Sequence, residues 1–579
     1  MLLRAARRLV RLPPGLWITV SLAGVLGWAA GLRALAGAGG GDELPLAQGT
    51  AGMLLAGVVA LGAARLGLGW SWRRAVVVCA ALCAPGLLGF AAPLAAHVRL
   101  PPPNDLPLRA VQIWLALAWV SGVLLSAELT LLGLWLDQEA PRRPRRLTLR
   151  LFGLCWLTYL ALALWTAGWT STGDTPRYLM MTRALAERGS MDLKPEYLAR
   201  SWVLFHDRDD VGADADSLGK VAAMYNQHRP GLPLLMAPGW LLLGPWGARW
   251  VHTGLAAAGA ALVFWVALSV GLNPGQALGA FALFAFSAPW LLQSPGAMTE
   301  LFSGLLWLLV LAAWARCLPA PAAFLAAGFL PWVHLRFLAV SVLLLLQSAW
   351  LLPRRRWVWL AAGLALVAGS EWLLHRQFGV WSPLDVYRLT NALPASDLSP
   401  MNLPRGLAGL WLDQEYGWLI WAPAFGMAGA GLLRLWRRDR GRALAWLPGL
   451  LLYLAPLGPI SFWHGNMAPA RYLVPLAPML ALLCAEAFDL GRSTGQRLLL
   501  LWTLALGWLM AVLPWLCYSK MEGQNILLRI VGGHLGVDLC SLFPSFIVSW
   551  TTPVDLAWMA AAVLALALSL RLWGASGRP

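Results

Sequence analysis

The stretch LTLRLFGLCWLTYLALALWTAGW, residues 147–169, decides the fold, because it carries one charged residue in its 23 positions. An α-helix needs about 20 apolar residues to cross the hydrocarbon core of a bilayer. Similar stretches recur along the 579-residue chain, whose mean hydropathy is +0.64 and which contains only 12% charged residues. These values lie far outside the range of soluble domains. The sequence therefore predicts an all-α polytopic integral membrane protein.

We expect about 16 transmembrane helices, with the N- and C-termini in the cytoplasm. The expected spans are 16–36, 47–68, 74–97, 109–136, 147–169, 249–271, 277–293, 298–316, 320–333, 337–352, 357–374, 418–434, 443–461, 472–490, 498–517 and 553–573. Under this threading the Arg clusters fall in cytoplasmic loops, as the positive-inside rule requires. The formal charge of +17 is scattered over these loops, so we expect no nucleic-acid partner.

The expected spans divide the chain into three segments. Residues 1–146 form an N-terminal four-span membrane extension, residues 147–517 form the main transmembrane module, and residues 518–579 add an outer loop and a final span. The main module has two large outer loops, 170–248 and 375–417, and the first holds 9 of the 27 acidic residues. The cytoplasmic connections are short. Chemistry is therefore expected on the outer face, and no cytoplasmic domain is large enough to bind a nucleotide.

The first outer loop begins with STGDTPRYL, directly after the apolar stretch. Thr175 followed by Pro176 predicts a helix start with Thr175 as the N-cap, and Gly189 can end that helix. We expect this short amphipathic helix to lie on the membrane surface. Asp174 is then either a solvated loop acid or a catalytic carboxylate held at the interface. The local pattern leaves both interpretations open.

Basic residues also stand at outer helix ends, against the positive-inside bias. Their position predicts an anionic partner, such as a protein acid, a lipid headgroup or a phosphate. His228 and Arg229 precede a Pro-interrupted apolar segment. The others are His334, Arg336, His464 and Arg471. They are either snorkelling interfacial side chains or donors to a phosphate, which an Arg guanidinium fits well. A divalent metal has no support from the histidine spacing, and the sequence predicts no definite cofactor.

A second acidic group lies in GLWLDQEYGWLIWAP, residues 409–423. Asp413 and Glu415 stand two residues apart just before an expected span, and Tyr416 follows them. One interpretation is an interfacial turn anchored by the neighbouring tryptophans. The other is a secondary acidic site that positions an acceptor or pairs with the outer Arg residues. The spacing alone is weakly specific.

Taken in order, the segments GDTPRYL, HRPGLPLLMAP, LPWVHLRF, LDQEYGWLIWAP and WHGNMAPARYLVP resemble the GT-C superfamily of integral membrane glycosyltransferases. These enzymes use polyprenyl-phosphate-linked sugars, and the likeness is to bacterial aminoarabinose and protein-mannosyl transferases. The resemblance covers roughly residues 147–517. It implies a GT-C-like core with juxtamembrane helices in the first large outer loop, and a bacterial inner-membrane location.

The resemblance also implies roles for the residues of the GDTPRYL motif. In the family the first large outer loop carries the essential acid, which corresponds here to Asp174, with Arg177 and Tyr178 beside it. The usual pattern is Asp-Glu-Pro-His-Tyr-Leu, whereas this chain has Thr175 in place of the second acid. The motif therefore leaves Asp174 as the sole acid of the site.

The implied reaction transfers a sugar from polyprenyl phosphate to a glycan, lipid or protein acceptor on the periplasmic face, with inversion. Asp174 would act as general base, and His228, Arg229, Arg336 and Arg471 would neutralise the leaving phosphate. Two other classes stay open: a transporter or flippase of lipid-linked glycans, and a non-catalytic GT-C-like membrane protein.

Overall fold

The computed structural model describes residues 144–166, 174–205, 222–352, 356–389, 399–465, 467–491, 493–512, 516, 523–547 and 551–575. Every regular element in these ranges is a helix. The chain divides into two compact units, Met1–Thr166 and Ala167–Pro579. The boundary therefore follows helix α6 (Pro144–Trp165), whereas the sequence placed it before this helix. The four spans expected within residues 1–146, and both termini, lie outside the described residues.

The lengths and apolar composition of three helices indicate a membrane protein. In the described part of the chain, three helical stretches are long and apolar enough to cross a bilayer: Pro144–Leu164, Gly231–Ser269 and Arg356–Leu389. Shorter apolar helices of 10 to 17 residues accompany them. The described part of the chain is thus all-helical and has helices long and apolar enough for a membrane protein, as its hydropathy predicted, while the full set of sixteen spans stays a prediction.

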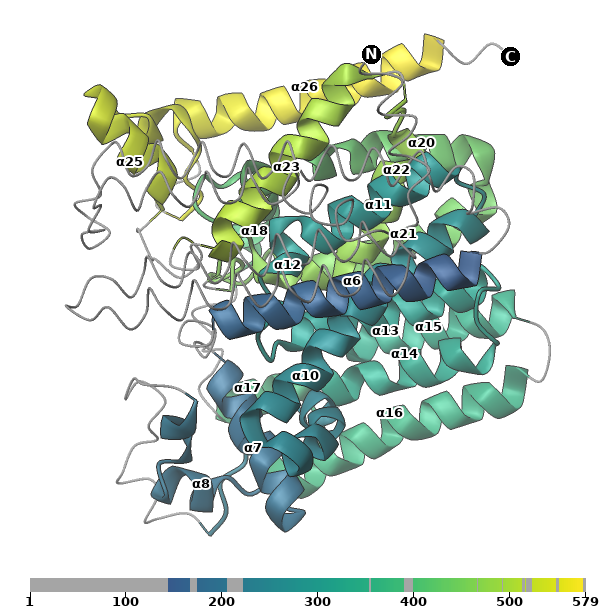
Figure 1. Cartoon of the computed structure of the whole chain (residues 1–579), viewed down its shortest axis with the longest axis vertical. Coiled ribbons are helices and arrows are strands. Elements are labelled where there is room, and N and C mark those ends of the chain that lie inside the picture. The colour runs from purple at the N-terminus through teal and green to yellow at the C-terminus, as the bar shows by residue number, and fades with distance from the viewer. Residues whose placement is uncertain are drawn as a thin grey trace, which may run out of the picture. The chain divides into compact units, whose positions relative to one another are not determined.

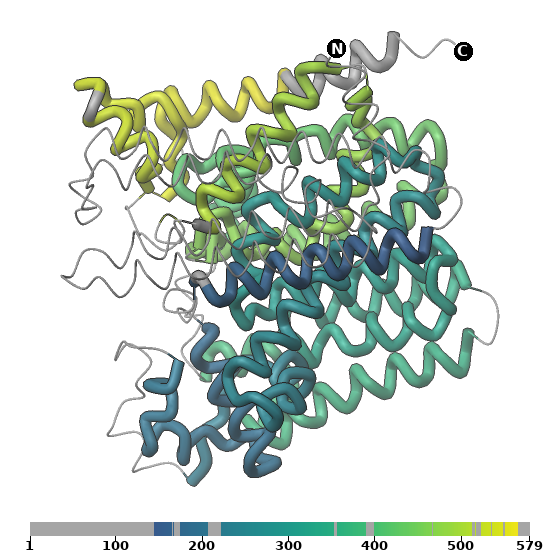
Figure 2. The backbone as a smooth tube through the Cα atoms, viewed as in Figure 1, coloured from purple at the N-terminus to yellow at the C-terminus, as the bar shows by residue number. Residues whose placement is uncertain are grey.

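Four helices lie side by side in the second unit (Figures 1 and 2). They are α13 (Thr299–Trp314), α14 (Pro321–Val333), α15 (Leu338–Leu351) and α16 (Arg356–Phe378). Helix α14 contacts the other three. Its Gly328 meets Gly363 of α16 so closely that a Cβ at Gly328 would lie 2.5 Å from the Gly363 carbonyl oxygen. Only glycine allows this approach of the two backbones.

A proline near the end of α14 is compensated by its neighbour α15. Pro331 has no N–H, so it leaves the carbonyl of Ala327 without its helical donor. The Ser341 hydroxyl of α15 donates to that carbonyl at 2.6 Å. Helix α14 ends just beyond Pro331, so His334 and Arg336 follow at the end of this group of helices.

Helix α10 (Gly231–Ser269) bends back on itself, because Leu243 and Gly244 leave the helical conformation. Gly244 has a φ of +58°, which glycine adopts at little cost. The two arms touch at Gly239 and Gly247, where a Cβ on Gly239 would lie 2.4 Å from the Gly247 carbonyl oxygen. The sequence predicted that Pro230 and Pro233 would break this segment, but the helix starts after Pro230, continues through Pro233 and breaks at Leu243–Gly244.

The predicted helix after the first apolar stretch is α7 (Thr175–Arg188). Asp174 is its N-cap residue and makes no side-chain cap hydrogen bond, so the prediction of Thr175 as the N-cap is wrong by one residue. Gly189 ends the helix in the left-handed conformation, as predicted. Tyr178 and its neighbours are buried, and α7 packs against α10. The apolar face of α7 is therefore covered by protein, rather than left free for the membrane surface.

The remaining elements lie partly within the expected spans and partly in the outer loops. They are α8 (Lys194–Leu198), η2 (Ser201–Leu204), α11 (Pro274–Phe286), α12 (Ala288–Leu291), η4 (Leu335–Phe337), α17 (Pro383–Leu389), η6 (Pro400–Asn402), α18 (Leu403–Leu412), α19 (Trp418–Trp421), η7 (Pro423–Met427), α20 (Ala428–Arg438), α21 (Arg440–Leu454), η8 (Arg471–Leu476), α22 (Ala477–Ala487), α23 (Thr494–Val512), α25 (Ile526–Leu535), η9 (Cys540–Leu542) and α26 (Pro553–Ala575). The expected spans 277–293 and 418–434 are each broken. Both breaks lie beside a proline, Pro289 and Pro423, which disfavours a continuous helix.

Two polar groups lie at opposite ends of the continuous segment η8–α22. At its far end Glu486 pairs with Arg438, which also donates to the carbonyl of Val270 at the end of α10. Arg434 donates to the backbone of Glu486. The sequence analysis placed these Arg residues in a cytoplasmic loop. Arg side chains can satisfy the free carbonyl groups at the C-terminal ends of helices. The segment starts at Arg471, where a second polar group gathers.

Candidate functional site

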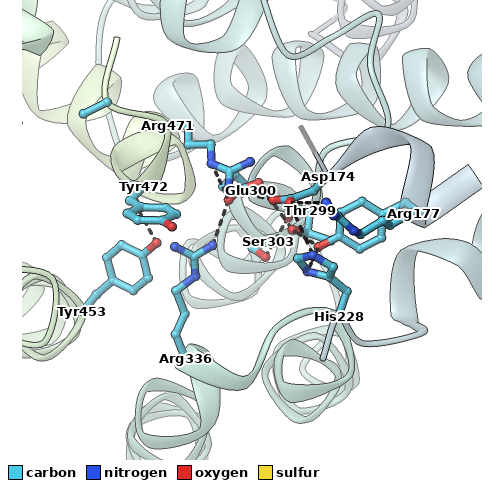
Figure 3. Close-up of polar contacts among 12 residues, drawn as sticks. Asp174, Arg177, His228, Thr299, Glu300, Ser303, Arg336, Tyr453, Arg471 and Tyr472 are labelled. Carbon is cyan, nitrogen blue, oxygen red and sulfur yellow. Dashed lines mark hydrogen bonds and ion pairs between the residues drawn. The ribbon is translucent and has the colours of Figure 1, made fainter. Parts of the chain in front are cut away.

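Asp174, at the start of α7, faces cations from separate parts of the chain (Figure 3). Its Oδ2 lies 2.7 Å from Nη2 of Arg471. Its Oδ1 lies 3.4 Å from Nε2 of His228 and 3.9 Å from Nη1 of Arg177. The fold thus brings together four residues that the sequence singled out as site candidates. The side chain of Asp174 remains 20% exposed, so a substrate can reach it.

The charges around Asp174 set its protonation state. Burial alone would raise the pKa of the carboxyl, because it disfavours the charged form. Arg471 and His228 outweigh burial and hold the pKa of Asp174 well below its usual range. The carboxylate is therefore ionised at neutral pH. It is also a weak base while Arg471 stays in place, because base strength falls with pKa.

Acid should destabilise the fold through Asp174. A carboxyl with a lower pKa in the folded state contributes stability above its unfolded pKa of about 3.9, and loses it as the pH falls toward the folded value. The thermal midpoint in detergent should therefore drop more steeply between about pH 5 and about pH 3 in the wild type than in Asp174→Asn. Asp385→Asn, which alters an exposed acid paired with Arg388, should keep the wild-type slope. Equal slopes in the wild type and Asp174→Asn would contradict the prediction.

A second carboxylate, Glu300, lies on the other side of Arg471. It belongs to the first turn of α13 and is 3% exposed. Its Oε1 lies 2.8 Å from Nη2 of Arg336 and 3.8 Å from Nε of Arg471. Asp174 is therefore not the sole acid of this group, contrary to what the motif implied. The signal in the sequence was an acid inside an expected span, which is costly unless it has a partner or a function.

His252 of α10 fixes the segment that leads into Glu300. Its Nδ1 lies 3.2 Å from the carbonyl oxygen of Ser294, and its Nε2 lies 3.3 Å from both the nitrogen and the oxygen of Met298. A neutral imidazole has one donor and one acceptor. Both contacts are satisfied when Nδ1–H donates to Ser294 and Nε2 accepts the N–H of Met298. The start of α13 is thereby tied to α10.

Aromatic side chains border the two guanidinium groups. The Cζ of Arg336 lies 4.4 Å from the ring centroid of Tyr472, and that of Arg471 lies 5.4 Å from the same ring. The Tyr453 hydroxyl donates to the Tyr472 carbonyl at 2.7 Å. The Nε atoms of Arg336 and Arg471 have no hydrogen-bond partner among the described residues. Both guanidinium groups therefore keep donor capacity for an anion.

Arg229 does not join this group, although it follows His228 directly. It is 2% exposed, and its guanidinium donates to the carbonyl of Pro331 in α14 and to Ser370 in α16. Arg229 thus links the end of α14 to the interior of α16. The expected contact of Arg229 with a phosphate receives no support from its position, whereas His228 meets Asp174.

His334 supports Arg336 rather than facing a ligand directly. Its Nδ1 accepts the backbone N–H of Arg336 at 3.3 Å and so caps the turn η4. Burial and the positive charge of Arg336 hold the pKa of His334 well below its usual range, so this imidazole is neutral. His464 stacks on Tyr416 at a centroid distance of 4.3 Å.

The carboxylates of the second acidic group, Asp413 and Glu415, accept hydrogen bonds from backbone N–H groups. Asp413 is fully buried and accepts the N–H groups of Glu415, Tyr416 and Phe546 at 2.8 to 2.9 Å. Glu415 accepts the N–H of Gly523 at 2.7 Å. These contacts tie the turn after α18 to a distant segment. The role of Asp413 and Glu415 in positioning an acceptor stays a prediction, because no described contact connects them to Asp174.

The group around Arg471 has the parts for one kind of chemistry. It offers a partly exposed, ionised carboxylate, Asp174, that can accept a proton. It also offers two partly exposed guanidinium groups, Arg336 and Arg471, that can neutralise an oxyanion. Within the described ranges, no three His, Cys, Asp or Glu side chains gather as ligands of a metal would. No protein-family model, no curated protein and no solved structure matches this chain.

Proposed function

We propose that this protein is a GT-C-type membrane glycosyltransferase that moves a sugar from a polyprenyl-phosphate donor to an acceptor on the outer face of the bacterial inner membrane. The observation that carries the proposal is the ion pair of Asp174 with Arg471, which also lies near Glu300, the partner of Arg336. A proton acceptor and an anion-binding pair at one helix end are what such a transfer needs. The order of the sequence motifs supplies the reaction class.

The donor phosphate would bind between Arg336 and Arg471. A polyprenyl-phosphate sugar is a phosphodiester with one negative charge, and the polyprenyl phosphate that leaves is a monoester with two. Guanidinium groups placed where this charge develops stabilise the transition state. Each guanidinium can bind two oxygens of a phosphate side by side, and both guanidinium groups lie over the ring of Tyr472.

Asp174 would take the proton of the acceptor hydroxyl or amine as that group attacks the anomeric carbon from the opposite side. Inversion follows from this single displacement. In the resting structure Arg471 keeps Asp174 a weak base. Because a bound phosphate competes for Arg471, donor binding would raise the pKa of Asp174 and strengthen the base. Donor binding and activation of the base are thus linked through one side chain.

The proposed topology has sixteen spans, a GT-C-like core over residues 147–517, and both termini in the cytoplasm. The separation of Arg471 and Glu486 to opposite ends of η8–α22 supports it. Residues 1–146 would be an added four-span domain. Lipid, glycan and protein acceptors all suit a partly exposed carboxylate on the outer face.

The test uses the purified full chain in lipid nanodiscs with a set of polyprenyl-phosphate hexoses and pentoses, and with lipid A, a glycan and a peptide as acceptors. Release of polyprenyl phosphate together with glycosylated acceptor is the expected result. Asp439→Asn should match the wild type, because Asn caps helix α21 as well as Asp does. Movement of the intact donor across vesicle membranes without release would instead favour a flippase. Neither release nor movement would favour a non-catalytic protein.

A further inference from the structure

Five side chains form a continuous series of polar contacts between the two carboxylates. Figure 3 labels Asp174, His228, Thr299 and Glu300 among them. The contacts are Asp174 Oδ1 to His228 Nε2 at 3.4 Å, His228 Nδ1 to Tyr178 Oη at 3.0 Å, Tyr178 Oη to Thr299 Oγ1 at 3.1 Å, and Thr299 Oγ1 to Glu300 Oε2 at 3.3 Å. They connect α7, the segment before α10 and the first turn of α13. Every member can donate or accept a proton.

The middle of this series is closed to solvent. Tyr178 and Thr299 are each 1% exposed, and Glu300 is 3% exposed. Asp174, at the other end, is 20% exposed. A proton that enters at Asp174 and reaches Glu300 therefore has to pass through the intervening side chains, because the buried members have little contact with bulk water.

Counting protons shows where the series is incomplete. We take His228 as neutral and both carboxylates as ionised. The series then has four contacts but only three hydrogen-bonding protons, one each from the imidazole, Tyr178 and Thr299. Thr299 directs its hydroxyl to Glu300. If Tyr178 donates to Thr299 and Nδ1–H of His228 donates to Tyr178, only the contact between Asp174 and Nε2 lacks a proton. That contact is the longest of the four.

We propose that these five residues form a proton relay that carries the acceptor's proton from Asp174 to Glu300; this inference rests on the proposed function. The acceptor O–H or N–H bond breaks, and its electron pair forms the bond to the anomeric carbon. The proton arrives on Asp174 and passes to Nε2 of His228. The Nδ1 proton moves to Tyr178, the Tyr178 proton to Thr299, and the Thr299 proton to Glu300. Each intermediate group gives and receives one proton.

The relay also balances charge at the guanidinium pair. Protonation removes one negative charge from Glu300, which otherwise occupies Arg336 at 2.8 Å and Arg471 at 3.8 Å. In the same step the departing phosphate gains one negative charge. The two arginines thus exchange a carboxylate for the added phosphate charge, and the local net charge stays the same. This gives Glu300 a role that a purely structural acid would lack.

The charged and titratable groups around His228 come from several elements. They are Asp174, Arg177 and Tyr178 at the start of α7, Glu300 of α13, His334 and Arg336 at η4, and Arg471 at η8. Asp174 lies 3.4 Å from Nε2 of His228, so the carboxylate that receives the acceptor's proton is also the neighbour of the first relay group.

The first part of the test needs no substrate. A proton shared along a hydrogen-bonded series gives a broad continuous infrared absorption, which we expect on acidification of the full chain in nanodiscs. Thr299→Val and Tyr178→Phe should abolish it, because each removes one hydroxyl and keeps the side-chain shape, while Thr299→Ser should retain it. A continuum unchanged in both interrupted variants, or absent from the wild type, would overturn the relay.

The second part measures sugar transfer with whichever polyprenyl-phosphate sugar the wild type uses. Thr299→Val should slow turnover at least about 10-fold, with Thr299→Ser close to the wild type. Thermal midpoints should be compared, so that a folding defect is recognised. Wild-type turnover in Thr299→Val would overturn the relay but leave the transferase intact. A wild type that shows the continuum but uses no donor would contradict the proposed function instead.

Discussion

Replacing Asp174 with Asn should lower the rate of sugar transfer by about 10²- to 10⁴-fold, the usual contribution of a general base. The amide has nearly the same shape as the carboxylate but cannot accept the proton. It also releases Arg471 from its 2.7 Å pair, so donor binding should persist or tighten. We therefore expect kcat to fall while the KM for the polyprenyl-phosphate donor does not rise, measured by release of polyprenyl phosphate in nanodiscs.

The split between kcat and KM separates a base from a structural acid. If Asp174 only held Arg471 in place, its loss would misplace the guanidinium and raise the donor KM. Asp439→Asn provides the matched control, because it makes the same chemical change at the N-cap of α21. A kcat close to that of the wild type in Asp174→Asn would refute its assignment as the base.

Removing Arg336 should destabilise the fold by about 3 to 5 kcal/mol, because it leaves Glu300 as a buried carboxylate without its nearest cation. The side chains of Arg336 and Glu300 are 12% and 3% exposed, so water cannot replace the lost partner well. The double variant Arg336→Gln/Glu300→Gln should recover most of the loss. Free energies of unfolding by SDS titration in mixed micelles would measure this coupling.

An exposed pair on α7 provides the comparison for this double-mutant cycle. Arg183 and Glu187 lie 2.9 Å apart with side chains 27% and 45% exposed. The corresponding cycle there should give a coupling of only about 0.3 to 0.5 kcal/mol, as for other surface helix pairs. Similar couplings at the two pairs would contradict the claim that burial strengthens the Arg336–Glu300 pair.

The sequence predicted the helical architecture well, because apolar length is a local property of the chain. It also predicted that the acid after the first apolar stretch would be near outer basic residues, and Asp174 does meet His228 and Arg471. The two broken spans were missed because Pro289 and Pro423 stand within otherwise uninterrupted apolar stretches. Hydropathy measures how apolar a segment is, and does not measure its backbone conformation.

The misses at the site come from tertiary contacts. His228 and Arg229 are adjacent, yet one meets Asp174 and the other links α14 to α16. No sequence pattern indicates which of two neighbouring side chains turns inward at a loop. Glu300 comes 126 residues after Asp174, and only the packing of α13 brings it to the same guanidinium. Thr175 stands where the family pattern has a second acid. Its presence did not indicate that Glu300, far along the chain, would supply the second acid of the group.

The backbone contacts of two histidines restrict which imidazole can donate from both of its ring nitrogens. His252 and His334 each use a ring nitrogen to accept a backbone N–H, from Met298 and Arg336 respectively. A proton added to that nitrogen would face the amide hydrogen and break the contact. His228 instead has an oxygen acceptor at each nitrogen, Asp174 on one side and the Tyr178 hydroxyl on the other. Of these three rings, only His228 can donate from both nitrogens without loss of a described contact.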